Sequence, residues 1–398
     1  MIAFTPTLGA EPAAIIDPQS IVDLAEAAKK SVAVGRAVVP NGGGTGQDYG
    51  YPVRAESFAV VNTSRLNRVV AVEPGDLTIT VEAGATLAQV QDALRPHGLF
   101  LPIDVPHPER ATVGGILATN AFGASRLGYG TARDWCIGLS VVGANGAVTK
   151  SGGKVVKNVT GYDLPKLHIG ALGSLGIIAE ATFKASPMPE AERTVLVQLG
   201  NDSVGGVGTY IRDALNTVSP TRFYGRRDNT GTYFVAHFTG FAEAVESEAE
   251  HCAAIARANV SERRTVSVME EATTHETPTG AVVLQAVGVL EEQWQAFFQT
   301  TMCGENAVSE TWYGTGVTRI CFADAMATEG LGTLRELVET PDYPCFNDYS
   351  LLHAPLALRQ GDFPVWYPEP ASLPLMRRIK KALDPGGVFN PGRFVGRI

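Results

Sequence analysis

Glycine is concentrated in one part of this chain, and that concentration most constrains the fold. Of the 43 glycines, 23 lie within residues 35–176, and 20 are spread over the other 256 residues. Glycine adopts positive φ angles and lets a ligand approach the main chain closely. The segment is not of low complexity, so it predicts either a backbone wrapped around a large ligand or a β-rich domain with many tight turns.

The first glycine-rich motif, residues 41–46, reads Asn-Gly-Gly-Gly-Thr-Gly and follows a short β-rich run. Consecutive amides with little side-chain bulk can form a nest for phosphate oxygens, and Thr45 adds a hydroxyl donor. The motif is neither a G-x-G-x-x-G fingerprint nor a P-loop, because no Lys-Ser/Thr pair follows it. Taken alone, the motif fits two alternatives equally well: a phosphate-binding loop and an ordinary glycine-rich loop.

A second motif spans residues 106–123 and contains the pair Gly114-Gly115. Two adjacent glycines let a flat ring system stack against the main chain. Thr112 and Thr119 offer hydroxyl groups to a ring edge or a phosphate. The alternative is an irregular turn.

The third motif, residues 170–176, reads Gly-Ala-Leu-Gly-Ser-Leu-Gly. Its glycine spacing is like that of a dinucleotide-binding fingerprint, which lies between a strand and a helix. Here the motif precedes a predicted strand and opens no helix, so the sequence excludes the Rossmann interpretation.

Hydrophobic periodicity and turn residues predict an α+β chain. Asp17 as N-cap and Pro18 as the first helical residue predict a helix to about residue 30, and Thr86 caps a second helix that ends before Gly98. Residues 101–187 are expected to form short strands separated by turns. The predicted strands of this part are 36–39, Phe58–Asn62, Val69–Glu73, Thr78–Glu82, 138–142, 146–150 and Ile177–Lys184.

The pattern changes after the boundary Pro187-Met188-Pro189. Strands at 195–199, 221–225, 233–238 and Val282–Val287 alternate with helices at 207–215, 242–258 and 291–301. This alternation predicts an antiparallel sheet with helices over one face. A last helix, Leu373–Leu383, is expected to point Leu375, Met376, Ile379 and Leu383 inward.

Charge and cysteine content exclude several classes of protein. The formal net charge of −9 disfavours binding to nucleic acid or to an anionic membrane surface. The cysteines have no C-x-x-C spacing, so no metal site is predicted, and they read as isolated thiols in a reducing compartment. They are Cys136, Cys252, Cys303, Cys321 and Cys345. Residues 1–18 do not resemble a signal peptide, and no run of about 18 apolar residues occurs, so a cytoplasmic protein without membrane insertion is expected.

The three motifs, in this order, resemble the FAD-binding domain of the vanillyl-alcohol oxidase/p-cresol methylhydroxylase (PCMH) flavoprotein superfamily. Residues 383–394, Leu-Asp-Pro-Gly-Gly-Val-Phe-Asn-Pro-Gly-Arg-Phe, are similar to the closing motif of that family. The resemblance implies a two-subdomain PCMH-type FAD-binding domain with an inserted α+β cap. We expect the FAD-binding domain at residues 1–188, a cap for substrate or partner at 189–370, and a returning segment at 371–398.

The resemblance also implies the cofactor contacts. The diphosphate would be held by Asn41, Gly42, Gly43, Gly44, Thr45 and Gly46. The flavin and ribityl chain would lie along Pro106, Thr112, Gly114, Gly115, Thr119, Asn120 and Phe122, with Asn390 returning the C-terminal segment to the flavin. The adenosine side would contact Ser174, Leu175, Gly176 and Ile178. Members with covalent flavin often carry His where Thr45 stands, so noncovalent FAD is expected.

Residues 156–167, Val-Lys-Asn-Val-Thr-Gly-Tyr-Asp-Leu-Pro-Lys-Leu, look most like the FAD-binding subunit of bacterial glycolate oxidase, the smaller of two flavin subunits. This implies a complex with a second flavin subunit and an iron–sulfur subunit, a small 2-hydroxy acid as substrate, and peripheral contact with the inner membrane through those partners. The H-x-G-D-G-N segment of larger relatives is missing. The alternatives are a free-standing FAD oxidase or dehydrogenase of another alcohol or sugar acid, and a non-catalytic flavin-binding assembly subunit.

Oxidation of a 2-hydroxy acid needs a base for the hydroxyl proton, a cation for the carboxylate and an acceptor for the hydride. Candidate cations are Arg319, Arg359 and Arg393. Candidate bases are His353, Tyr349 and His107. The sequence does not choose among them, and it assigns no catalytic residue.

Overall fold

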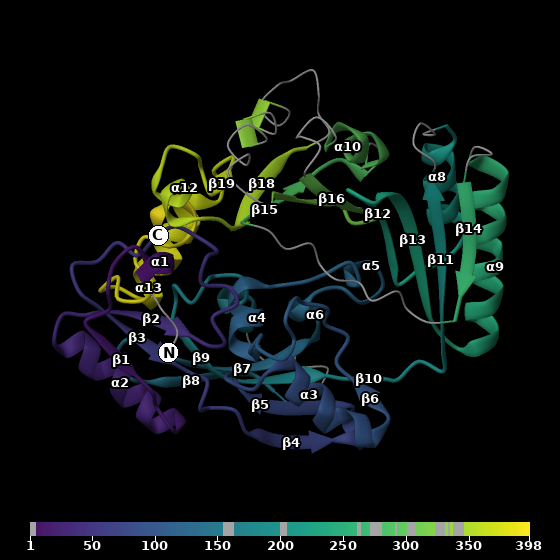
Figure 1. The fold of residues 1–398 in the computed structure, drawn as a ribbon. Helices are drawn as coiled ribbons and strands as arrows, with labels where there is room; N and C mark the ends of the chain where they lie inside the picture. The colour runs from purple at the N-terminus through teal and green to yellow at the C-terminus, as the bar shows by residue number, and fades with distance from the viewer. Residues whose placement is uncertain are drawn as a thin grey trace.

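The computed structural model describes most of the chain, and its two main parts face each other (Figure 1). The described residues are 5–153, 163–199, 205–260, 264–270, 281–290, 293–300, 307–322, 331–332, 335–336 and 346–398. The lower part in Figure 1 is built from residues 14–187, and the upper part is a nine-stranded sheet. The predicted α+β class is confirmed.

A small parallel sheet begins the lower part. Its strand order is β1 (Ala14–Ile16), β3 (Phe58–Asn62) and β2 (Ala37–Asn41). Helix α2 (Ile21–Ala33) packs Leu24 and Ala28 on this sheet. The helix begins later than predicted, because Ser20 is its N-cap and accepts a hydrogen bond from the Asp23 amide.

A five-stranded antiparallel sheet completes the lower part. Its order is β4 (Val69–Glu73), β5 (Thr78–Glu82), β9 (Ile177–Lys184), β7 (Cys136–Val142) and β8 (Val148–Gly152). The capping box at Thr86 starts α3 (Leu87–Leu94), as predicted. Residues 101–187 are not strands and turns alone, because Val113–Thr119 forms helix α4 with Thr112 as N-cap. This helix packs Val113, Ile116 and Leu117 into the core of the sheet.

The upper part is an antiparallel sheet with helices over one face, as predicted. Its order is β14 (Arg264–Met269), β11 (Ala191–Leu199), β13 (Gly231–Gly240), β12 (Arg222–Asp228), β16 (Ala307–Trp312), β17 (Val317–Phe322), β15 (Val282–Val287), β18 (Asp348–His353) and β19 (Trp366–Tyr367). Helices α8 (Val207–Thr217), α9 (Ala242–Asn259) and α10 (Gln293–Gln299) share one core with the outer face. Alternation along β12 places Phe223 in that core and Tyr224 on the opposite face, toward the lower part.

The chain then returns to the lower part through α13 (Leu373–Leu383) and the tail, where Phe389 bridges Val38 in parallel. The inward face predicted for α13 is wrong for Leu375 and Leu383, which are 52% and 42% exposed. Met376 and Ile379 are half-buried, and Leu373 is the fully buried residue of the helix. The shorter elements are α1 (Thr5–Leu8), β6 (Leu99–Phe100), α5 (Arg126–Tyr129), α6 (Ala132–Trp135), α7 (Pro165–His168), β10 (Ser186–Pro187) and α12 (Leu356–Gln360). Across the described ranges, no helix is both long enough and apolar enough to cross a membrane.

Candidate functional site

Two adjoining cavities lie at the glycine-rich motifs, and the second of them also reaches the upper sheet. We call the first the crevice; it is narrow, about 80 Å³, and runs between the loop 41–47, α4, residues 172–178 and the tail. We call the second the chamber; it is about 580 Å³ and lies between the second motif and strands β15, β17 and β18. Both cavities are lined by Gly44, Thr45, Gly46, Tyr49, Gly115 and Thr119, so they are continuous.

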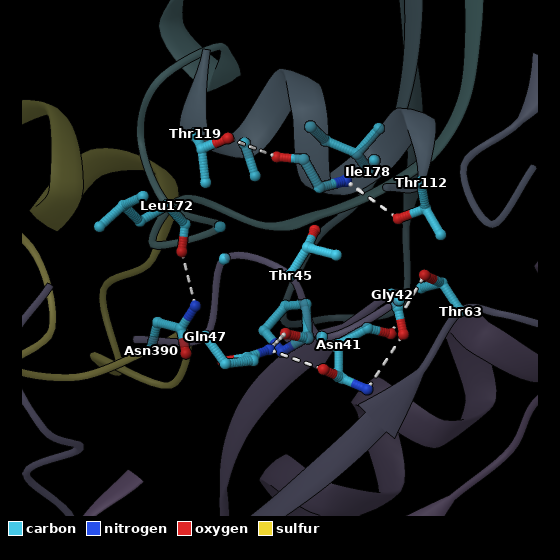
Figure 2. Close-up of a pocket in the computed structure, with 18 of the residues that line it drawn as sticks. Asn41, Gly42, Thr45, Gln47, Thr63, Thr112, Thr119, Leu172, Ile178 and Asn390 are labelled. Atoms are coloured by element: carbon cyan, nitrogen blue, oxygen red, sulfur yellow. Dashed lines mark hydrogen bonds between the residues drawn. The ribbon is translucent and has the colours of Figure 1, made fainter. Parts of the chain in front are cut away.

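The first motif forms one wall of the crevice with main chain (Figure 2). Asn41 fixes its start, because the side chain donates to Asn62 Oδ1 at 2.8 Å and accepts from Gln47 Nε2 at 2.9 Å. A Cβ on Gly43 would overlap the carbonyl oxygen of Arg110. The loop therefore packs against the second motif so closely that only glycine fits.

Helix α4 forms the facing wall. Thr112 caps it by accepting a hydrogen bond from the Gly115 amide at 3.3 Å, and the Thr119 hydroxyl donates to the Gly115 carbonyl at 2.8 Å. Figure 2 shows Thr112 and Thr119 on the side of the crevice opposite Asn41. The second motif is thus a short helix whose glycines keep the wall flat.

The third motif and the tail close one end of the crevice. Asn390 donates through Nδ2 to the Leu172 carbonyl at 2.6 Å, and both residues have positive φ angles, 44° and 50°. Ser174 and Leu175 line neither the crevice nor the chamber. The carbonyl of Ser174 instead accepts a hydrogen bond from Lys380 of α13 at 2.7 Å.

Three buried polar atoms at the two cavities suit a ligand that carries both hydrogen-bond donors and an anionic group. Asn120 Oδ1, Asn390 Oδ1 and Arg393 Nε have no hydrogen-bond partner within the described part of the chain. Such atoms cost about 1–3 kcal/mol each when left unsatisfied. Burial, and then the nearby Arg359 cation, lowers the pKa of Arg393 to about 10, so it stays cationic at neutral pH. The main-chain amides of the cradle and Arg393 fit the diphosphate of FAD, which needs donors and positive charge. The two amide oxygens fit its N–H and hydroxyl groups.

Arg319 is the buried cation among the described residues that line the chamber. It lies on β17 opposite Gln285 of β15, and its Nη2 donates to the Phe122 carbonyl at 2.7 Å. Its guanidinium also lies 4.4 Å from the centre of the Trp312 ring. Burial lowers the pKa of Arg319 to about 10, which leaves it protonated at neutral pH.

The other candidate cations have structural partners. Arg359 is fully buried and donates to the main-chain carbonyls of Ala354, Gly50 and Thr7. Arg393 lines the crevice and donates to Gln47.

Among the candidate bases, His353 and His107 line the chamber, and Tyr349 does not. Tyr349 is 1% exposed and stacks on Tyr367 within an apolar core. His353 Nδ1 lies 3.1 Å from Asp48 Oδ2, whereas His107 is half-exposed beside the exposed Glu109. His353 is therefore the base candidate with an oriented partner.

The structure brings most of the predicted cofactor residues together. Those at the crevice are Asn41, Gly42, Gly43, Gly44, Thr45, Gly46, Thr112, Gly114, Gly115, Thr119, Gly176, Ile178 and Asn390. Those at the chamber alone are Pro106, Asn120 and Phe122. Residues 154–162, which carry most of the glycolate-oxidase-like motif, and Cys303 and Cys345 lie outside the described residues. Among the described residues, Cys136, Cys252 and Cys321 are buried thiols.

The sequence analysis missed Gln47, Tyr49, Gly173 and Ile177, which also line the crevice. Gln47 and Tyr49 directly follow the first motif, so their position was the available signal. In the described portion no cluster of three His, Cys, Asp or Glu side chains could hold a metal ion.

The same segments match two family models. Residues 12–152 match the FAD binding domain, and residues 362–394 match the C-terminal domain of FAD linked oxidases. The chain thus carries an FAD-binding domain of the PCMH type, and FAD is its cofactor.

Several curated relatives align with about half of the chain or less. D-2-hydroxyglutarate dehydrogenase from Xanthomonas citri pv. viticola is 37% identical over 47% of this chain and 40% of its own length. Glycolate oxidase subunit GlcD from Bacillus subtilis is 34% identical over 50% of this chain and 42% of its own. Glycolate oxidase subunit GlcE from Escherichia coli is 37% identical over 36% of this chain and 40% of its own. The chain therefore spans about two fifths of the length of each of these relatives.

Solved structures share the fold over nearly the whole chain. The 4-ethylphenol oxidase from Gulosibacter chungangensis superposes with a TM-score of 0.72, covering 98% of this chain and 91% of that one at 14% identity. At this identity the likeness shows the fold alone.

Proposed function

We propose that this protein is an FAD-dependent oxidoreductase that oxidises a small 2-hydroxy acid of the glycolate or D-lactate type. The observation that carries the proposal is the buried cation Arg319 in a chamber continuous with the cofactor crevice. The relatives named as glycolate oxidase subunits and as D-2-hydroxyglutarate dehydrogenase support the substrate class.

In this proposal the crevice holds the diphosphate and adenosine parts of FAD, and the chamber holds the flavin ring together with the substrate. The loop from Asn41 to Gly46 supplies main-chain donors to the diphosphate. Pro106, Asn120 and Phe122 lie where the ring would meet the substrate. When bound, FAD supplies the acceptor for the two electrons of the oxidation. Since Thr45 offers no ring nitrogen for a flavin bond, the cofactor is noncovalent.

Arg319 is proposed to bind the carboxylate of the substrate. A guanidinium group presents a fork of donors that matches a carboxylate, and burial strengthens the attraction. Phe122, Trp312 and Gln285 hold the guanidinium in place. His353 faces the same chamber and is proposed to accept the hydroxyl proton.

We further propose that the chain works beside a second flavin subunit and an iron–sulfur subunit that receive its electrons, with contact to the membrane surface through those partners. The support is its likeness to both glycolate oxidase subunits, GlcD and GlcE. The division into an FAD-binding domain (1–188), a cap (189–370) and a returning segment (371–398) is part of the same proposal. It is supported by the change of sheet between β10 and β11.

The test is the visible spectrum of the purified chain, recorded anaerobically before and after addition of glycolate or D-lactate. We expect a yellow protein that bleaches, with reduction retained or accelerated when the partner subunits are added. Bleaching only with partners would assign the substrate site to the complex. A yellow protein that no 2-hydroxy acid bleaches in either state would reject the proposal. Acid precipitation should release the flavin into the supernatant if it is noncovalent.

A further inference from the structure

The carboxylate of Asp48, just after the first motif, contacts the upper sheet beside the chamber. Asp48 follows the glycine loop by two residues and lines the chamber with His353 of β18. One oxygen, Oδ2, lies 3.1 Å from His353 Nδ1, and the other, Oδ1, lies 3.7 Å from Arg359 Nη2. Asp48 is therefore placed between the candidate base and a fully buried cation.

The segment that carries Asp48 is held in place on both sides. Arg359 donates through Nη1 to the Gly50 carbonyl at 3.2 Å. Arg393 donates to the Gln47 side chain and to the Gln47 carbonyl, both at 2.6 Å, and to the Tyr49 carbonyl at 3.1 Å. These charge-assisted hydrogen bonds fix the main chain on either side of Asp48. Its carboxylate is thus a rigid partner, unlike a surface carboxylate on a free loop.

The sheet register places His353 and Arg319 on the same face. His353 pairs with Val283 of β15 at a register shift between β15 and β18, and Arg319 pairs with Gln285, two residues further along β15. Both His353 and Arg319 line the chamber. Side chains two residues apart on a strand point to the same side. Strands β17 and β18 flank β15, so a cation and an imidazole approach the chamber from two strands about 10 Å apart.

We propose that Asp48 is a positioning residue for His353. Its carboxylate accepts the Nδ1 proton of the imidazole, which leaves Nε2 without a proton and free to face the substrate. This inference rests on the proposed function. In the reaction, the hydroxyl proton passes to His353 Nε2, and the hydrogen on the same carbon leaves with its bonding pair to oxidised FAD. The alcohol becomes a carbonyl, and Asp48 stabilises the imidazolium that forms.

Other charged groups around the chamber do not supply this role. Arg319 is held by Phe122 and Gln285 and is a cation at neutral pH. His107 and Arg110 also line the chamber, on the second motif. The contact of His107 is with Glu109, at 3.8 Å, and both side chains are more than half exposed. The described carboxylate that both lines the chamber and contacts His353 is Asp48.

The test compares Asp48→Asn with Asp104→Asn in the purified, flavin-loaded protein. Asp104 is a matched control, because it also lies on the lower part, is 18% exposed, and contacts Arg222 of the upper sheet at the limit of an ion pair, 4.0 Å. It does not line the chamber. The first readout needs no substrate: nitrogen-15 NMR of labelled histidines, with the His353 signal assigned by its loss in His353→Gln.

We expect the neutral His353 ring to carry its proton on Nδ1 in the wild type and in Asp104→Asn, and to lose that preference in Asp48→Asn.

The second readout is the limiting rate of flavin reduction by glycolate or D-lactate. It should fall by at least about tenfold in Asp48→Asn, with the dissociation constant of the substrate changed by less than about threefold. Asp48→Glu, which keeps the carboxylate, should recover part of the rate.

A His353 tautomer that is the same in wild type and Asp48→Asn would overturn the inference, as would an unchanged limiting rate. An equal loss of rate in Asp104→Asn would also overturn it, because the effect would then be a general one on the contact between the two parts. A wild-type flavin that no 2-hydroxy acid reduces would reject the proposed function and the proton transfer with it. The NMR result would still decide whether Asp48 orients the imidazole.

Discussion

The crevice and the chamber recognise their ligands with different parts of the chain. The crevice is lined mainly by glycines and main chain from four segments, and its side chains mostly bond to one another, as Asn41 does to Asn62. The chamber has the side chains of Arg319, His353 and Gln285, which three neighbouring strands present on one face. A main-chain site tolerates few substitutions at its glycines, whereas a side-chain site can change substrate by changing a few residues. We therefore expect the cofactor to be set by the crevice and the substrate by the chamber.

The largest expected effect is the loss of bound flavin when Gly43 of the crevice is replaced. In Gly43→Val the new side chain overlaps the Arg110 carbonyl, so the loop and the second motif must separate. We expect retained flavin, measured by absorbance after gel filtration, to fall by more than about tenfold. Gly75→Ala is the control, because a Cβ at Gly75 meets nothing within 4 Å. Full flavin content in Gly43→Val would contradict the main-chain recognition assigned to this loop.

A substitution in the chamber should have the opposite pattern: it should weaken substrate binding and leave the flavin content unchanged. Arg319→Gln removes charge-assisted hydrogen bonds worth about 1.5–3 kcal/mol, so we expect roughly 10- to 100-fold weaker substrate binding with flavin content preserved. Arg319→Lys keeps the charge but loses the guanidinium fork, so its substrate affinity should lie between those of the wild type and Arg319→Gln. Titration of flavin bleaching against substrate concentration measures the effect. Loss of flavin together with substrate affinity would mean that the two regions are not separable.

The contact between the lower and upper parts of the protein contains a buried histidine, His237. Burial, with a smaller effect of the Arg222 cation, lowers the pKa of His237 on β13 to about 4. The unfolded chain takes up a proton near pH 6.5, so the folded state loses stability as the pH falls from 6.5 toward 4. The loss is about 2 kcal/mol at pH 5 relative to pH 8. Urea unfolding at both pH values should show a smaller loss in His237→Gln, and an unchanged loss in the exposed-site variant His97→Gln.

The smallest expected effect concerns the side chain that the tail adds to the crevice. Asn390→Gly keeps a residue that tolerates the φ of 44° but removes the hydrogen bond to the Leu172 carbonyl. One such bond contributes about 1 kcal/mol, so we expect FAD to bind about fivefold more weakly in a fluorescence titration. A much larger loss in Asn390→Ala than in Asn390→Gly would show that backbone strain dominates at this position.

The first part of the fold was easier to predict than the second. Strands Phe58–Asn62 and Thr78–Glu82 have the predicted bounds, because turn residues flank compact apolar runs. Helix α4 was missed, because Gly114-Gly115 lowers helix propensity, and tertiary packing overrides it: a Cβ at Gly114 would already touch Ala83. Strands β16 and β17 were also missed, although glycines at 314 and 316 mark the turn between them.

The two cavities of the candidate site also differ in how well the sequence predicts them: the crevice was predicted better than the chamber. The crevice residues stand in three short motifs, so their order along the sequence already indicated a common site. The chamber residues depend on strand register, and a shift of one residue would turn Arg319 away from the chamber. The sequence therefore named three arginines without choosing, and it gave no sign that Asp48 would meet His353, because that contact joins two sheets.

The hydrogen bonds between Arg393 and Gln47 join residues that are 346 positions apart. A ribosome releases Gln47 long before Arg393, and the whole upper sheet is synthesised in between. The nascent chain therefore has an incomplete cofactor pocket until Arg393 has been synthesised, and stable flavin capture is expected only after that point. Stalled or prematurely terminated chains should accumulate as colourless protein, however well their first sheets have formed.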